Sequence, residues 1–108
     1  MLAVALGAFG AHALEGQIGV RAVAFWRTAS LYHLVHAAVV AALVFAPEGG
    51  RRWIPAGLLL AGIALFSGSL YLLAVTGHRP LARLTPVGGL FLLLGWATLP
   101  LALSGRPR

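Results

Sequence analysis

The sequence contains no cysteine and no lysine, and Glu15 and Glu48 are its only acidic residues. The absence of cysteine excludes a disulfide framework, a thiolate nucleophile and a metal site built from cysteine ligands. The absence of lysine excludes Schiff-base chemistry. Neither glutamate lies within an apolar segment, so the chain also lacks the intramembrane acid that proton and cation pathways commonly use.

Apolar side chains, in contrast, are abundant: 60% of the 108 residues are hydrophobic and 9% are charged. A soluble domain of this length could not cover so much apolar surface. Residues 53–76 and 84–103 carry no charge, and each segment has the ~20 residues that an α-helix needs to cross the hydrocarbon core of a bilayer. Residues 23–46 form a third candidate span, with the aromatic pair Phe25 and Trp26 at the expected membrane interface.

Residues 1–14 form a fourth apolar segment, which at ~1.5 Å per residue covers about two thirds of the hydrocarbon core. A signal peptide is not expected, because no basic residue precedes the apolar part. We expect instead that this helix is truncated or that its start is misassigned.

The connections between the segments are short and contain residues that end helices, such as Pro47 with Gly49, and Gly77 with Pro80. Short connections force neighbouring helices to run antiparallel. The sequence therefore predicts an all-α polytopic membrane protein: one membrane domain over residues 1–108, folded as an antiparallel up-down bundle of four transmembrane helices.

The eight basic residues are all arginines, and they stand at the ends of the apolar segments, where they would meet water and lipid phosphate. No continuous basic face with interleaved aromatic residues is present, so nucleic acid is not an expected partner. The arginines divide equally between the two sides of the bundle, and the positive-inside rule gives no preference. The α-amino group adds a positive charge to the side of the termini, which we therefore expect in the cytoplasm.

Small residues recur in every span at spacings that place them on single helix faces, where they allow close helix packing. The residues expected to serve this role are Gly7, Gly10, Ala11, Ala64, Gly68, Gly88, Gly89 and Gly95.

Polar residues inside the second span form a stripe, because Thr28, Tyr32 and His36 follow one another at intervals of four. His33 lies beside this stripe, and both histidines fall ~13 to 18 Å along the helix, near the bilayer centre, where they should face the bundle. The other spans offer partners for them. The candidate polar cluster therefore comprises His12, Thr28, Tyr32, His33, His36, Ser67, Ser69, Tyr71 and Thr85.

This cluster is open to more than one interpretation. The histidines could be neutral and have only a structural role, because their hydrogen bonds would offset the cost of burying polar groups in hydrocarbon. Haem or metal ligation by His36, His33 or His12 is an alternative that would need a homo-oligomer, since two histidines of one helix cannot ligate both faces of one haem. A minimal pathway for protons or small solutes is another alternative. A hydrolase is disfavoured, because no carboxylate is available to orient a base.

Several motifs resemble those of a known family: Ala-Leu-Gly-Ala-Phe-Gly-Ala-His at 5–12, Tyr32 with His33 and His36, Leu-Phe-Ser-Gly-Ser-Leu-Tyr at 65–71, and Leu-Thr-Pro-Val-Gly-Gly at 84–89. On these motifs the chain resembles the membrane family catalogued as domain of unknown function 423. That family consists of small multi-spanning proteins of bacterial inner membranes with relatives in eukaryotes. The resemblance implies an inner-membrane location and a four-helix bundle, but no established activity.

We therefore expect a non-enzymatic accessory or scaffold subunit without catalytic residues or an established cofactor. Its expected partners are the lipid bilayer and either further copies of the chain or other membrane subunits. A small lipid or quinone-like ligand near the histidines and tyrosines is compatible with this role.

Overall fold

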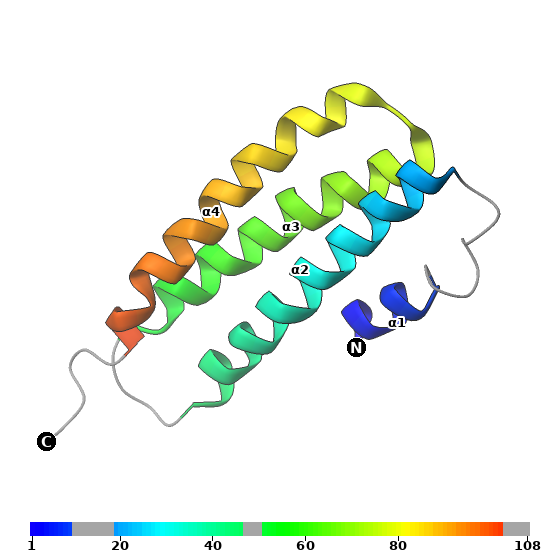
Figure 1. Ribbon diagram of the computed structural model, residues 1–108. Helices are drawn as coiled ribbons and strands as arrows, with labels where there is room; N and C mark the ends of the chain where they lie inside the picture. Colours follow the sequence, from blue (N-terminus) through cyan, green and yellow to red (C-terminus); the bar gives the residue numbers. More distant parts are fainter. Residues whose placement is uncertain (10–18, 47–50, 103–108) are drawn as a thin grey trace, which may run out of the picture.

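The computed structural model describes residues 1–9, 19–46 and 51–102, and the regular structure in these ranges is entirely helical. The α-helices are α1 (Leu2–Phe9), α2 (Val20–Phe45), α3 (Trp53–Thr76) and α4 (Leu84–Thr98), and the short 3-10 helices η2 (Arg79–Arg83) and η3 (Leu99–Ala102) flank α4 (Figure 1). The prediction of an all-α fold is therefore confirmed for the described residues.

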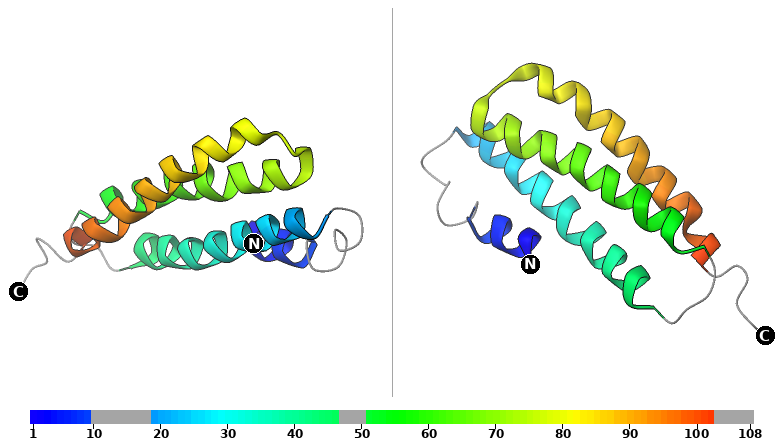
Figure 2. Two further views of the ribbon diagram at one scale, coloured as in Figure 1. Left: turned by 45° about the horizontal axis from the view of Figure 1, so that its top comes forward. Right: turned by 180° about the vertical axis from the view of Figure 1, so that it is seen from behind.

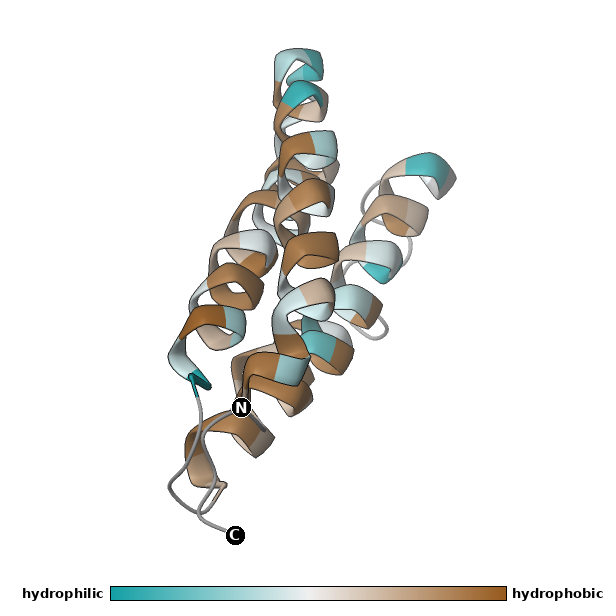
Figure 3. Ribbon diagram, turned by 90° about the vertical axis from the view of Figure 1, so that its left-hand side faces the viewer, coloured by the Kyte–Doolittle hydropathy of each residue, from teal (hydrophilic) through white to brown (hydrophobic). Residues whose placement is uncertain are grey.

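Three helical segments are long and apolar enough to cross a membrane: Arg21–Phe45, Trp53–Thr76 and Arg79–Ala102. Figure 3 shows apolar residues along most of each helix and hydrophilic residues at several helix ends. Many large apolar side chains on the outside of the protein are exposed, among them Leu60 and Leu93. Such a surface suits contact with lipid chains.

The helices pack in chain order, so that α3 lies between α2 and α4, and α1 packs on α2 (Figures 1 and 2). Consecutive helices run in opposite directions, as the short connections require. The helices thus lie in a layer in the order α1, α2, α3, α4, in which α3 separates most of α2 from α4.

The turn between α3 and α4 depends on Gly77, which ends α3 with φ +67° and donates its backbone N–H to the carbonyl oxygen of Leu73 at 2.8 Å. This left-handed conformation favours glycine, which has no Cβ. Pro80 then lies in η2, and Pro86 in the first turn of α4, where a missing N–H costs no helix hydrogen bond.

Glycines make the contact between α3 and α4 close. A Cβ built on Gly88 would overlap the backbone of Phe66, and one built on Gly95 would lie 2.5 Å from Cδ2 of Leu59. A Cβ built on a third glycine, Gly62, would lie 2.6 Å from Cδ2 of Leu92. Gly88 and Gly95, two of the residues expected at helix contacts, therefore lie where α3 and α4 approach closely, and so does Gly62.

The other residues that the sequence predicts at helix contacts do not lie at the close contact between α3 and α4. Ala64 is exposed, and a Cβ on Gly68 would meet no atom within 4 Å, so the face of α3 that meets α4 carries Gly62 instead of these two residues. The packing around Gly7 and Gly89 is less tight, because a Cβ at either position would make only ordinary contacts at 3.8 Å or more. Gly10 and Ala11 lie outside the described residues.

Candidate functional site

Helix α2 places Tyr32 and His36 one turn apart on the same face. Their rings are stacked, with centroids 5.8 Å apart and planes 8° from parallel, and the Tyr32 ring also lies 4.5 Å from that of Phe66 on α3. Thr28, one turn before Tyr32, is exposed at the surface of α2. The stripe that the sequence predicts thus contributes two of its three members to this aromatic group.

A hydrogen bond between His36 and Trp96 links α2 to α4 across α3. The indole Nε1–H of Trp96 donates to Nε2 of His36 at 2.9 Å, and Nδ1 of His36 lies 2.7 Å from the carbonyl oxygen of Tyr32. An indole can only donate and a carbonyl can only accept, so the contacts assign a neutral ring with its proton on Nδ1. Both ring nitrogens of this buried histidine are therefore engaged.

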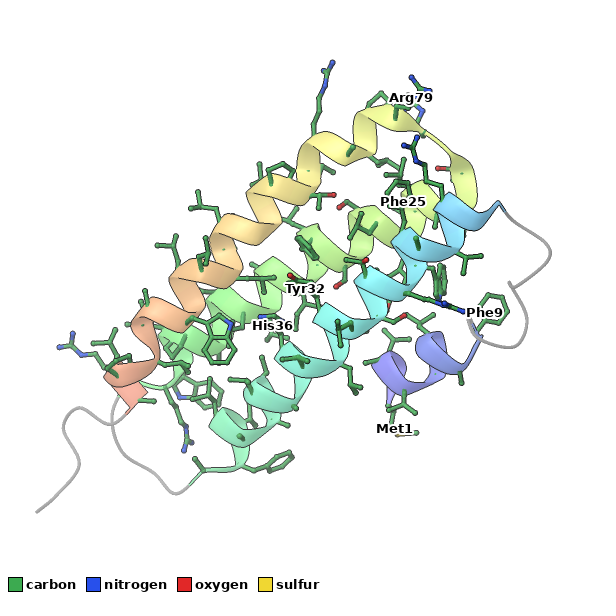
Figure 4. The ribbon with its side chains drawn as sticks, in the orientation of Figure 1. Met1, Phe9, Phe25, Tyr32, His36 and Arg79 are labelled. Atoms are coloured by element: carbon green, nitrogen blue, oxygen red, sulfur yellow. The ribbon has the colours of Figure 1, made fainter. Side chains whose placement is uncertain are left out.

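An open groove of about 470 Å³ lies beside this pair, between α2 and α4. Figure 4 labels Tyr32 and His36, the two residues that α2 contributes to it. Phe66 of α3 lies between the two walls, and the remaining residues come from α4: Pro86, Gly89, Leu90, Leu92, Leu93 and Trp96. The groove is mainly apolar, with the hydroxyl of Tyr32 and the His36–Trp96 pair as its polar groups.

A second polar group joins α2 to α3 away from the groove. The hydroxyl of Tyr71 donates to Oγ of Ser30 at 3.2 Å, and Nδ1 of His33 lies 3.1 Å from the same phenol oxygen, which it can use as an acceptor. Trp26 packs edge-on against Tyr71 at 4.5 Å and donates its indole N–H to the carbonyl oxygen of Leu6 at 2.7 Å. These contacts hold α1, α2 and α3 together.

The serines of α3 are bonded separately. Ser67 is buried and donates to the carbonyl oxygen of Ala29 on α2 at 2.8 Å. Ser69 lies 2.6 Å from Oγ1 of Thr85 on α4 and 2.9 Å from the carbonyl oxygen of Phe66. The predicted polar cluster is therefore divided around α3 into separate groups, and His12 lies outside the described residues.

The two histidines of α2 do not converge on a common point, because His36 faces Trp96 of α4 and His33 faces Tyr71 of α3. Within residues 1–9, 19–46 and 51–102, no three histidine, aspartate or glutamate side chains are grouped as metal ligands could be. Within one copy of the chain, His33 and His36 thus lie in separate hydrogen-bonded groups.

Trp96 and Phe66 complete the groove and were not among the residues that the polar pattern predicts. Trp96 could have been found from its position: an indole N–H several residues inside an apolar segment needs an acceptor, and a histidine on another span is a candidate. Phe66 carries no such signal, because one phenylalanine in an apolar helix does not reveal which face it occupies.

Comparison with known proteins identifies relatives over nearly the whole chain. The family model described as "Protein of unknown function (DUF423)" matches residues 6–89. The "UPF0382 membrane protein YwdK" of Bacillus subtilis is 45% identical over 106 residues, which cover 94% of this chain and 86% of that protein. The "UPF0382 membrane protein C1782.12c" of Schizosaccharomyces pombe is 38% identical, with 92% of this chain and 89% of that protein covered. No solved structure matches.

Proposed function

This chain belongs to the DUF423 family of membrane proteins, and we propose that it is a non-enzymatic subunit that binds a flat, quinone-like lipid in the groove between α2 and α4. The proposal places it in the bacterial inner membrane, with its helices antiparallel and its termini in the cytoplasm. The observation that carries the proposal is the groove itself: an aromatic, laterally open pocket within the apolar length of three helices.

The size and lining of the groove favour a ring-bearing ligand. Its volume of about 470 Å³ lies within the range of small-molecule sites, which are concave, mainly apolar and equipped with few polar groups. The rings of Tyr32, Phe66 and Trp96 offer aromatic surface for stacking. Because Leu90, Leu93 and Trp96 of the groove wall are exposed at the surface of the protein, a lipid-soluble ligand could enter the groove from the bilayer.

The polar groups of the groove favour an oxygen acceptor on the ligand. Tyr32 is 40% exposed, and its hydroxyl could donate a hydrogen bond to a quinone carbonyl. Both ring nitrogens of His36 are already engaged, Nδ1 by the backbone carbonyl of Tyr32 and Nε2 by the indole of Trp96, so the ring orients the Trp96 side chain in the groove wall. This engagement of Nε2 is why we prefer a quinone-like ligand to a haem.

An accessory role is compatible with the outer surface. The exposed apolar side chains of the helix layer, for example Leu34 and Leu60, suit packing against lipid or against a second membrane subunit. The chain would then present its bound ligand to a partner or store it near one.

Replacement of Gly89 by leucine should block the groove without separating the helices. A Cβ on Gly89 would lie 3.8 Å from the Phe66 ring, which is an ordinary contact, so the longer side chain extends into the groove. In detergent, titration of the purified protein with a short-chain benzoquinone should show saturable binding, and Gly89→Leu should weaken it by about tenfold or more. The thermal midpoint of the variant should stay near that of the wild type.

The matched control is Gly68→Leu, which adds the same side chain to open space on α3. It should leave the quinone affinity unchanged and should not lower the thermal midpoint. Equal affinity in the wild type and Gly89→Leu, or no saturable binding at all, would refute the quinone proposal. A Soret band in the purified wild type would favour the haem alternative instead.

A further inference from the structure

A second cavity, of about 600 Å³, lies at the end of the protein where α2 begins and α3 ends. Its walls come from α2, α3 and η2. The lining residues are Gly19, Arg21, Ala22, Phe25, Leu73, Ala74, Gly77, Arg79 and Ala82. It shares no residue with the groove beside His36, so it requires an explanation of its own.

The cavity has a basic part and an apolar part. Arg21 of α2 and Arg79 of η2 are both exposed and both line it, and none of the nine lining residues is acidic. Phe25, Leu73 and Ala74 form the apolar part, and the last two are buried. Figure 4 labels Arg79 and Phe25 at this end of the protein. Two cations above an apolar base match a ligand with an anionic head and a hydrocarbon body.

The level of the cavity in the membrane follows from its two arginines. Arg21 is the first residue of the apolar segment Arg21–Phe45, and Arg79 is the first residue of Arg79–Ala102. Both guanidinium groups therefore belong to the boundary between hydrocarbon and water, where lipid phosphates lie. A guanidinium can bind two phosphate oxygens at once through paired N–H groups.

The start of α2 adds to the attraction for an anion. Gly19 is the N-cap of this long helix and supplies no side-chain hydrogen bond to the first turn. The amide N–H groups there and the positive end of the helix dipole are favourable for a negative charge. Gly19, like Arg21, lines the cavity.

We propose that this cavity binds the phosphate of an anionic phospholipid, with Arg21 and Arg79 paired to its oxygens and the acyl chains lying against Phe25 and Leu73. Phosphate chemistry alone would also admit a free phosphate ion. The apolar base favours the lipid, because inorganic phosphate would leave that surface without a partner.

The test uses the whole chain purified in a neutral detergent, with native mass spectrometry and thermal unfolding as two readouts. Phosphatidylglycerol should bind as one tightly held molecule per chain and raise the thermal midpoint. Phosphatidylcholine and inorganic phosphate, added separately, should do neither at the same concentration. The double variant Arg21→Gln/Arg79→Gln should bind phosphatidylglycerol about tenfold more weakly.

The control is Arg51→Gln/Arg52→Gln, which removes the same two charges at the beginning of α3. It should keep the affinity for phosphatidylglycerol. An equal loss in the two double variants would show unspecific charge attraction and overturn the proposal. Stabilisation by inorganic phosphate equal to that by phosphatidylglycerol would also overturn it, since the site would then recognise the ion and not the lipid.

Discussion

Replacement of Gly88 by leucine is expected to separate α3 from α4 and to lower the free energy of unfolding by about 3 kcal/mol or more. A Cβ at this position would overlap the backbone of Phe66 and lie 2.7 Å from the carbonyl carbon of Leu65. A flexible side chain could rotate away from such a clash, but a helix backbone cannot. The helices would have to move apart, and close packing is the main source of helix association in lipid.

This expectation can be checked by thermal unfolding in detergent, followed by circular dichroism, with Gly68→Leu as the matched control. A side chain at Gly68 would meet no atom within 4 Å, and leucine favours the helix more than glycine does. The control should therefore be as stable as the wild type or slightly more stable. A Gly88→Leu protein that unfolds at the wild-type midpoint would contradict the placement of Gly88 against α3.

The second large loss of stability is expected when the hydrogen bond between His36 and Trp96 is removed. His36→Leu would leave the indole N–H of Trp96 without its acceptor, and Trp96→Phe would leave Nε2 of His36 without its donor. Each change should lower the free energy of unfolding by about 1–3 kcal/mol, because a polar group left unpaired within the apolar length of the helices is costly. The double variant should lose less than the sum, with a coupling energy of about 1 kcal/mol.

A double-mutant cycle measured by denaturant titration in detergent micelles gives this coupling energy. Trp53→Phe combined with His36→Leu is the control pair, because Trp53 lies at the start of α3 and packs with Arg52 at 5.0 Å. Its coupling to His36 should be close to zero. Additive losses for His36 and Trp96 would mean that their contact does not stabilise the fold.

The three long helices could be predicted from the sequence because length and hydrophobicity determine them in an apolar chain. Of the first segment, expected at 1–14, the structure describes a helix over Leu2–Phe9. The third segment was expected at 53–76, and α3 has the same bounds. The second was expected from residue 23, whereas α2 begins at Val20, so that Arg21 lies inside its first turn. An arginine at a helix start keeps its charge in water and breaks no helix hydrogen bond, and the pattern of apolar residues cannot distinguish it from a loop residue.

The packing of the helices was predictable only in part. Gly88, Leu92 and Gly95 form the stripe of α4 that meets α3, while Pro86, Gly89 and Trp96 on the adjacent stripe line the groove. Neighbouring glycines thus have opposite roles, one in contact with a backbone and one beside a cavity. Only the rotation of each helix about its axis decides between these roles, and a helix that is apolar on all faces carries no periodic signal for that rotation.

The division of the polar cluster has the same origin. The expected cluster placed the polar residues of four helices in one group, because a histidine inside a span should face its neighbours. In the structure α3 lies between α2 and α4, so His33 bonds to Tyr71 while His36 reaches across to Trp96. Residues three apart on one helix point in directions about 60° apart, enough to assign them to different partners.

The central claim, that the groove beside His36 holds a quinone-like ligand, is tested most directly by photoaffinity labelling. An azido-benzoquinone activated on the purified protein in detergent should label residues of the groove walls, above all Tyr32 and Trp96. Excess unlabelled quinone should suppress this labelling, and Gly89→Leu should abolish it. Labelling spread evenly over the exposed apolar faces of the helices, and unaffected by excess quinone, would contradict the claim.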